Sequence, residues 1–140
     1  MISWTFVLPY PPSVNHYKKL GKISLTKSGK LYQARVNSPE TLNYYKEVHW
    51  KVAQERIGAP RTDLISMTVD LHPPDNRKRD IDGPLKVLLD SLQRAAVYKD
   101  DCQIYKLVVE KKWVEPQGLA VVNIYPWEAP QKGPVVFSNN

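Results

Sequence analysis

The stretch "LISMTVDLHPPD", residues 64 to 75, decides the fold that this sequence can adopt. Apolar and polar side chains alternate along it, which is the pattern of a β-strand with one face in a core. The apolar set is Ile65, Met67, Val69 and Leu71. Pro73 and Pro74 have no amide donor and therefore end the strand. It is the clearest strand of the chain.

A helix is predicted beyond this strand, from about Pro84 to Ala96. Its narrow apolar face consists of Leu85, Leu88, Leu89, Leu92 and Ala96. Val87 falls on the opposite face, where a monomer would leave it exposed, and this hints at a second subunit. Two strands are expected next, in "CQIYKLVVEKKWV" (102–114) and "LAVVNIYPW" (119–127), and "EPQG" between them has hairpin turn chemistry.

Before the first strand, the sequence predicts another strand, a loop and a helix. "SWTFVLP" (3–9) is the strand, and residues 9–33 form a loop of interleaved tyrosines and lysines with a "KSGK" turn at its tip. Such a mixture suits nucleic acid, although it is equally typical of a solvated surface loop. Ser38 as N-cap and Pro39 open a helix that ends near Ile57, before Gly58. Its apolar stripe is Leu42, Tyr45, Val48 and Val52.

This order of elements predicts an α+β fold, in which a mixed β-sheet packs against two main helices. The 140 residues suit a single domain with its own core. We place that domain at residues 1–126 and a C-terminal tail at residues 127–140, because the tail lacks periodicity.

Charge and cysteine content narrow the classes of function. Lys and Arg outnumber Asp and Glu by 20 to 14, and the pI is about 9.4, so a polyanion is the favoured partner. The single Cys102 excludes an internal disulfide and a cysteine-based zinc site. No apolar run is long enough for a membrane span, and the start does not resemble a leader peptide. We therefore expect a cytoplasmic protein that does not bind membranes.

Four aspartates flank the second predicted helix. Asp80 and Asp82 precede it, and Asp100 and Asp101 follow it. Hard divalent cations prefer such oxygen ligands, and magnesium needs only a few carboxylates beside water and substrate phosphate. The histidines have no zinc-ligand spacing, and Lys86 stands where a calcium loop from Asp75 would need a glutamate.

Each of these residues also has a structural interpretation. Asp82 can be an acid favoured by the helix dipole, and Lys86 can be an i to i+4 partner of Asp82 or of Asp90. Stability does not require the additional Asp80, nor the cations of Arg77, Lys78 and Arg79 directly before it. The combination indicates a metal-dependent phosphodiester hydrolase, in which the cations hold neighbouring phosphates and Lys86 stabilises developing charge.

Three quoted stretches give the chain a resemblance to the RusA family of Holliday junction resolvases. They are "LPYPPSVNHY" (8–17), "DNRKRDIDGPLKVLLDSL" (75–92) and "VYKDDCQIYKLVVEKKW" (97–113), and the likeness extends to about Pro126. The resemblance implies a RusA-like fold and a catalytic set of Asp80, Asp82, Lys86 and Asp101, whose three aspartates bind Mg²⁺, with Mn²⁺ as an alternative. The family usually has Asn where this chain has Gly83.

The resemblance also implies the partners. These are branched DNA, above all the four-way junction, and a second copy of the chain in a homodimer that makes two symmetric cuts during recombination and repair. The source would be a bacterium, a prophage or a phage. The predicted DNA contacts are Asn15, Lys18, Lys27, Lys30, Arg77, Lys78 and Arg79. Two alternatives stay open: a noncatalytic DNA-binding module, and a nuclease with a broader preference for forks and flaps.

Overall fold

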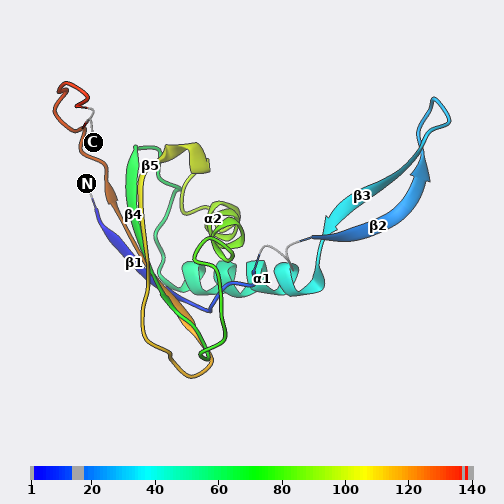
Figure 1. Ribbon diagram of the computed structural model, residues 1–140, viewed down its shortest axis with the longest axis horizontal. Coiled ribbons are helices and arrows are strands. Elements are labelled where there is room, and N and C mark those ends of the chain that lie inside the picture. The colour runs from blue at the N-terminus through cyan, green and yellow to red at the C-terminus, as the bar shows by residue number, and fades with distance from the viewer. Residues whose placement is uncertain (1, 14–17, 137, 139–140) are drawn as a thin grey trace.

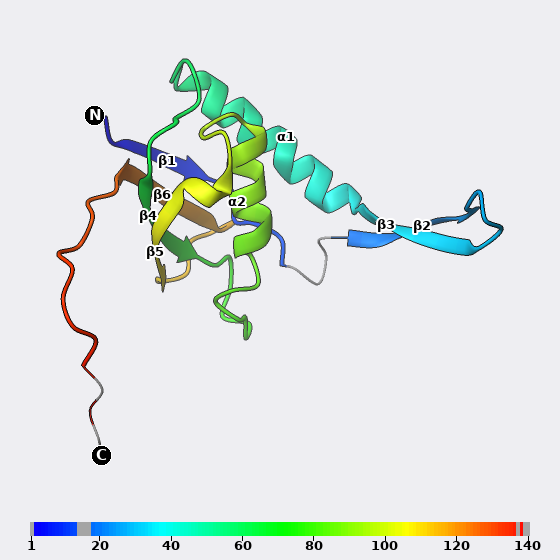
Figure 2. The ribbon, with the colours of Figure 1, turned by 90° about the horizontal axis from the view of Figure 1, so that it is seen from above.

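The computed structural model describes residues 2–13, 18–136 and 138. Its elements, in chain order, are β1 (Trp4–Leu8), β2 (Lys18–Leu25), β3 (Leu31–Asn37), α1 (Pro39–Gln54), β4 (Ile65–His72), α2 (Leu85–Arg94), the 3-10 turn η2 (Asp101–Gln103), β5 (Ile104–Lys111) and β6 (Leu119–Pro126). The fold is α+β with a mixed sheet and two helices, as predicted. Figure 1 shows both helices on one side of the sheet, and Figure 2 shows the same arrangement from above.

Strand β4 is the centre of this sheet, whose order is β1-β6-β4-β5. It pairs antiparallel with β6 on one edge and parallel with β5 on the other. The predicted alternation is confirmed, because the four apolar side chains of β4 are fully buried in the core that the sheet shares with both helices. Every backbone group of β4 can therefore pair within the sheet.

Helix α1 begins as predicted and ends earlier. The Ser38 hydroxyl accepts a hydrogen bond from the amide of Thr41 at 3.2 Å, which is an N-cap. The helix ends at Gln54 rather than near Ile57, because Arg56 already adopts a left-handed conformation (φ +51°). Leu42 was expected in the buried stripe but is 44 % exposed, and the buried face consists of Thr41, Tyr44, Tyr45, Val48 and Val52.

Helix α2 buries a wider face than the predicted leucine stripe. Leu88 and Leu92 are fully buried, and so is Val87, which belongs to the cluster shared by the sheet and α1. The expectation that a monomer exposes Val87 was wrong, and the hint of a second subunit drawn from it no longer holds. Ala96 is exposed and left-handed (φ +60°), because the helix has already ended at Arg94.

Strands β5 and β6 do not form the predicted hairpin, because β4 lies between them in the sheet. The connection crosses the end of β4, where the amide of Lys112 donates to the carbonyl of Leu71 at 2.8 Å. The amide of Glu115 then donates to the carbonyl of Pro73 at 3.1 Å. The predicted turn at residues 115–118 is present and reverses the chain beyond β4.

A hairpin of β2 and β3 stands where the sequence predicted a lysine-rich loop. It extends away from the sheet and helices (Figure 1), and its strands pair antiparallel with an irregularity between Leu20 and Ile23. Alternation with lysine and glycine hides these strands from a search for apolar periodicity. The predicted turn at the tip is confirmed, with Gly29 at φ +82°.

Beyond Pro126 the described residues form no helix or strand. The amide of Trp127 donates to the carbonyl of Leu64 at 2.9 Å, and its ring contacts that of Tyr105 edge to face. The division into a domain ending at residue 126 and a tail remains a prediction. Within the described ranges, no helix combines the length and apolarity needed to cross a bilayer.

Gly118 offers a test of the crossing connection. Its φ is +70°, and an added Cβ would lie 2.8 Å from the Cβ of Tyr10. We expect Gly118→Ala to lower the free energy of unfolding by roughly 1 kcal/mol, because alanine is strained in a left-handed backbone. The clash with Tyr10 should lower it by about 1–3 kcal/mol more. Gly58→Ala is the matched control, because Gly58 has φ +79° and open space around it. Urea unfolding measures both, and equal losses would contradict the close approach of Tyr10.

Candidate active site

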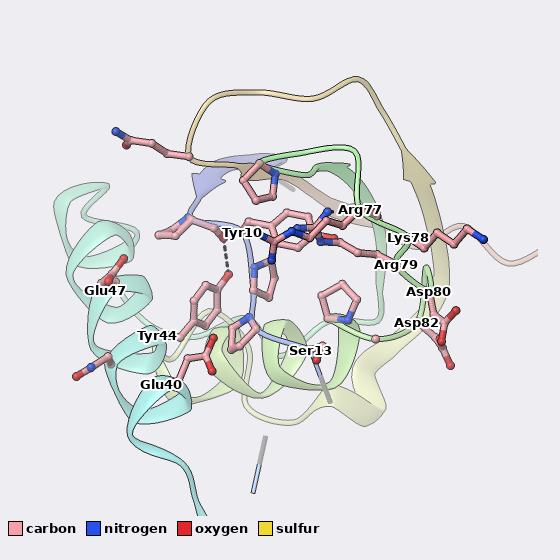
Figure 3. A pocket seen from close by; sticks show the side chains of 18 residues that line it. Tyr10, Ser13, Glu40, Tyr44, Glu47, Arg77, Lys78, Arg79, Asp80 and Asp82 are labelled. Carbon is pink, nitrogen blue, oxygen red and sulfur yellow. Dashed lines mark hydrogen bonds between the residues drawn. The ribbon is translucent and has the colours of Figure 1, made fainter. Parts of the chain in front are cut away.

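The loop between β4 and α2 forms one wall of a wide groove. It leaves the carboxyl end of β4 and reaches α2 at Leu85. The groove has a volume of about 950 Å³, and its other walls are the proline-rich segment after β1 and the first half of α1. Figure 3 shows Arg79 beside Tyr10, with Asp80 and Asp82 together at one end of the groove.

The floor of this groove is fixed to α1 and to the loop. The hydroxyl of Tyr44 donates to the carbonyl of Pro9 at 2.8 Å, drawn as the dashed line in Figure 3. The guanidinium carbon of Arg79 lies 5.9 Å from the ring centre of Tyr10. Burial raises the pKa of Tyr10, so its hydroxyl stays neutral at physiological pH. The floor therefore presents an aromatic ring covered by a cation.

Arg79 is bound mainly to Asp75, four residues earlier. Its Nη1 donates to the Asp75 carboxylate at 2.7 Å, to the Asp75 carbonyl at 3.1 Å and to the Arg77 carbonyl at 3.3 Å. The amide of Arg77 also donates to the Asp75 carboxylate, at 3.0 Å. Asp75 thus holds Arg79 and the backbone of Arg77 in place. Its carboxylate also offsets the positive charge of Arg79, which weakens the attraction of Arg79 for a distant phosphate.

The carboxylates of Asp80 and Asp82 are exposed, and no ion pair or side-chain hydrogen bond joins either to another described residue. Their backbone carbonyls support the turn into α2, accepting from the amides of Gly83 at 3.4 Å and Leu85 at 3.1 Å. Adjacent cations would ordinarily neutralise such acids, but Arg77 and Arg79 are paired with Asp75. Asp80 and Asp82 therefore remain available to a ligand.

Lys86 is paired with Asp90 rather than with Asp82, which answers the alternative that the sequence left open. The distance from Nζ to the Asp90 carboxylate is 3.1 Å, and the side chains are 56 % and 16 % exposed, respectively. The pKa of Lys86 is raised, first by this hydrogen bond and further by the charges of Asp90 and Asp101. Lys86 is thus kept protonated, so it can stabilise negative charge but is a poor general base.

Asp101 follows α2, whereas the first two aspartates precede it. Its backbone amide donates to the side-chain oxygen of Gln93, in the last turn of α2, at 3.0 Å. Asp80 and Asp82 precede the first turn of the same helix, and the charge of Asp101 acts on Lys86 in that turn. In the described part of the chain, no three acidic, histidine or cysteine side chains are grouped to hold a metal.

The pair of Asp80 and Asp82 nevertheless fits a hard divalent cation. Magnesium takes carboxylate oxygen, commonly from one or two side chains, and completes its coordination with water and substrate phosphate. Both carboxylates are exposed at the end of a groove, which leaves room for such additional ligands. The donor chemistry thus suits a site with two protein carboxylates, whereas a site with three would need Asp101 to approach.

Other acids near the site have structural partners. Asp100 caps η2, because its carboxylate accepts from the amide of Cys102 at 2.9 Å. The hydrogen bonds of this cap lower the pKa of Asp100. Glu110 pairs with Lys112 at 2.9 Å. The sequence prediction did not assign Asp75 a role, although its i to i+4 spacing to Arg79 was a usable signal.

The predicted DNA contacts are distributed over two regions. Arg77 and Lys78 are exposed on the loop, and Lys27 and Lys30 are exposed at the tip of the β2–β3 hairpin. Lys18 begins β2, and its side chain is outside the description. Asn15 lies outside the described residues. The structure therefore does not bring the hairpin cations and the loop cations into one cluster among the side chains that it describes.

The contacts of Asp75 with Arg79 and with the Arg77 amide, here called the Asp75 clamp, can be tested by titration. Hydrogen bonds from Arg79 and from the Arg77 amide lower the pKa of Asp75 to about 2, from an ordinary value of 3.8. Because the pKa of Asp75 is lower in the folded protein than in the unfolded chain, the clamp stabilises the loop fully above pH 3.8. This stabilisation is lost as the pH falls through about 2. We expect Arg79→Met to return the pKa of Asp75 toward 3.8, measured by carboxyl NMR. Asp63, paired with Arg61, should titrate unchanged in the same variant.

Comparison with known proteins shows the family of this chain. Residues 9–125 match the family model described as Endodeoxyribonuclease RusA. A crossover junction endodeoxyribonuclease of Enterobacteria phage HK97 is 32 % identical over 92 % of this chain and 99 % of its own length. Proteins of the same description from Aquifex aeolicus and Escherichia coli are 30 % and 29 % identical, covering 88 % and 84 % of this chain and 89 % and 90 % of their own lengths. The chain belongs to the RusA family of endodeoxyribonucleases.

Proposed function

We propose that this protein is a magnesium-dependent endonuclease that resolves four-way DNA junctions by paired, symmetric cuts in recombination and repair. The observation that carries the proposal is the exposed carboxylate pair of Asp80 and Asp82, left without side-chain partners in the described structure beside a cationic loop. A protein that only binds DNA gains nothing from two unneutralised acids facing phosphate. The names of its relatives, crossover junction endodeoxyribonucleases, support the same substrate class.

Asp80 and Asp82 are the proposed magnesium ligands, and manganese would suit the same oxygen donors. The bound ion would supply Lewis-acid chemistry at a scissile phosphate and make water a better nucleophile. Lys86 would stabilise the charge that develops on the phosphoryl oxygens, which its raised pKa favours by keeping the ammonium protonated. The groove gives the phosphodiester access to the pair from the side of Tyr10 and Arg77.

A homodimer is the proposed assembly, because two symmetric cuts in a four-way junction require two active sites. Val87 gives no support, since it is buried in the core of one chain. Asp101 remains a proposed third ligand, and its charge acts on Lys86 in the first turn of α2, which supports a place for it near the proposed site.

DNA contacts are proposed on both basic regions. Arg77 and Lys78 lie on the same loop as the carboxylate pair, while Lys27 and Lys30 are exposed at the tip of the β2–β3 hairpin, which extends away from the sheet (Figure 1) and would contact a different part of the DNA. Lys18 and Asn15 belong to the same proposal. Arg79 contributes through the loop that it holds with Asp75 as well as through its charge. We place the protein in the cytoplasm of a bacterium, encoded by the host or by a phage.

The substrate class is tested with three DNAs: a synthetic four-way junction, a fork and a linear duplex of matched sequence, each with and without magnesium. We expect paired nicks at the crossover of the junction only in the presence of magnesium. Binding without cleavage of any DNA, in magnesium or manganese, would leave a noncatalytic binding module. Equal cleavage of fork and junction would establish the broader nuclease instead.

Single substitutions test the residue roles. Asp80→Asn, Asp82→Asn and Asp101→Asn should each lower cleavage by more than about 10²-fold, because each removes a negative ligand at nearly constant size. Lys86→Ala should lower it by about 10² to 10³, and added magnesium should not restore the rate. Junction binding should persist in all four.

Glu55→Gln is the control for these variants, because Glu55 is exposed at the end of α1 and does not line the groove. Asp90 is unsuited as a control, since its loss would release Lys86. Gel-shift binding and single-turnover cleavage, with circular dichroism for folding, decide the outcome. An Asp82→Asn variant that cuts at the wild-type rate would remove the carboxylate pair from the mechanism.

A further inference from the structure

We propose that Lys111, at the end of β5, is a positioning residue for the carboxylate pair. Its ammonium group donates to the backbone carbonyl of Arg79, the residue directly before Asp80, at 2.7 Å. The inference rests on the proposed function of Asp80 and Asp82, and it adds a residue from another strand to that site. Lys111 would act by holding the loop and would not touch the DNA.

The parallel pairing of β4 and β5 explains why this lysine reaches the loop. Lys111 is opposite Leu71 in the register, so the two strands end side by side. The loop that carries Asp80 leaves β4 at that same edge, and its path brings the Arg79 carbonyl over the end of β5. A residue 32 positions later in the chain can therefore bind the loop near its middle.

The loop needs such a tether, because it contains no helix or strand between His72 and Leu85. Two hydrogen-bonded partners hold Arg79: Asp75 accepts from its guanidinium at 2.7 Å, and Lys111 donates to its carbonyl. The guanidinium carbon also lies 5.9 Å from the ring centre of Tyr10. The contact with Asp75 lies within the loop and moves with it. The hydrogen bond from Lys111 joins the backbone next to Asp80 to the sheet, so it helps to place Asp80 relative to the strands.

Lys111 does not neutralise a nearby carboxylate. In the described part of the chain no carboxylate forms an ion pair with Lys111, whereas its neighbour Lys112 pairs with Glu110 at 2.9 Å. An ammonium group that donates to a carbonyl forms a charge-assisted hydrogen bond, which is shorter and stronger than a neutral one. Catalytic groups require placement within fractions of an ångström, so loss of this bond should affect rate before it affects affinity.

The test compares Lys111→Met with Lys112→Met, two adjacent lysines of which only the first reaches the loop. We expect Lys111→Met to lower the single-turnover cleavage rate at saturating protein by about 10-fold or more, the effect of a displacement of under 1 Å. The junction affinity, measured by fluorescence anisotropy without divalent metal, should be retained. Lys112→Met should keep the wild-type rate, and Lys111→Arg should restore most of it, because arginine can donate to the same carbonyl.

Three results would overturn the inference. The first is an unchanged rate in Lys111→Met. The second is a loss of affinity with the slope of log affinity against log salt reduced by about 1, which would identify Lys111 as a phosphate contact. The third is an equal loss of rate in Lys112→Met, which would reflect charge alone. Thermal unfolding of each variant checks that the fold is retained.

Hydrogen exchange separates this inference from the proposed function. Amides of residues 76–83 should exchange faster in Lys111→Met than in Lys112→Met, whether or not the protein cuts DNA. If the wild-type protein cuts no branched DNA, the proposed function fails and the exchange data still decide whether Lys111 holds the loop. If the wild type cuts and the loop exchanges equally in both variants, the role of Lys111 is wrong and the nuclease assignment stands.

Discussion

The pairing of β4 on both of its edges is the constraint on which the rest of the structure depends. Antiparallel bonds to β6 connect β4 with β1, and parallel bonds to β5 require a crossover, which α2 supplies. A parallel pair ends at one edge of a sheet, so the loop that leaves β4 meets the end of β5. The candidate site lies beyond this end of the sheet, where a side chain of β5 reaches the backbone of the loop after β4.

The division of charge along the loop follows from this placement. Asp75 binds the arginines that would otherwise neutralise the aspartates beyond them, and Asp90 binds Lys86 on the helix. Acids close together in the sequence thus have different roles. Asp75 organises the arginines of the loop, whereas Asp80 and Asp82 remain accessible to a ligand. Net positive charge attracts a polyanion over a distance, but the local pairing decides which carboxylates can meet it.

The sequence predicted those features that depend on local pattern. The alternation in β4, the cap at Ser38 and the turn at Gly29 follow from neighbouring residues, and all three were found. Features set by distant contacts were not predictable in the same way. Val87 is buried because α1 and the sheet both pack against α2, and β5 is separated from β6 because a strand 40 residues earlier enters between them. The contact of Lys111 with Arg79 depends on that same register.

The sheet joins the first strand of the chain to the last. Thr5 and Asn123, 118 positions apart, are hydrogen-bonded through their side chains, and β1 is an edge strand that pairs with β6 alone among the strands that the structure describes. During synthesis, β4 can pair with β5 through the local α2 crossover, but β1 must wait until nearly the whole chain has left the ribosome. A chain that stops before Leu119 leaves the apolar faces of Phe6 and Leu8 without a strand to pair with, so premature termination should yield an aggregating fragment rather than a smaller folded nuclease.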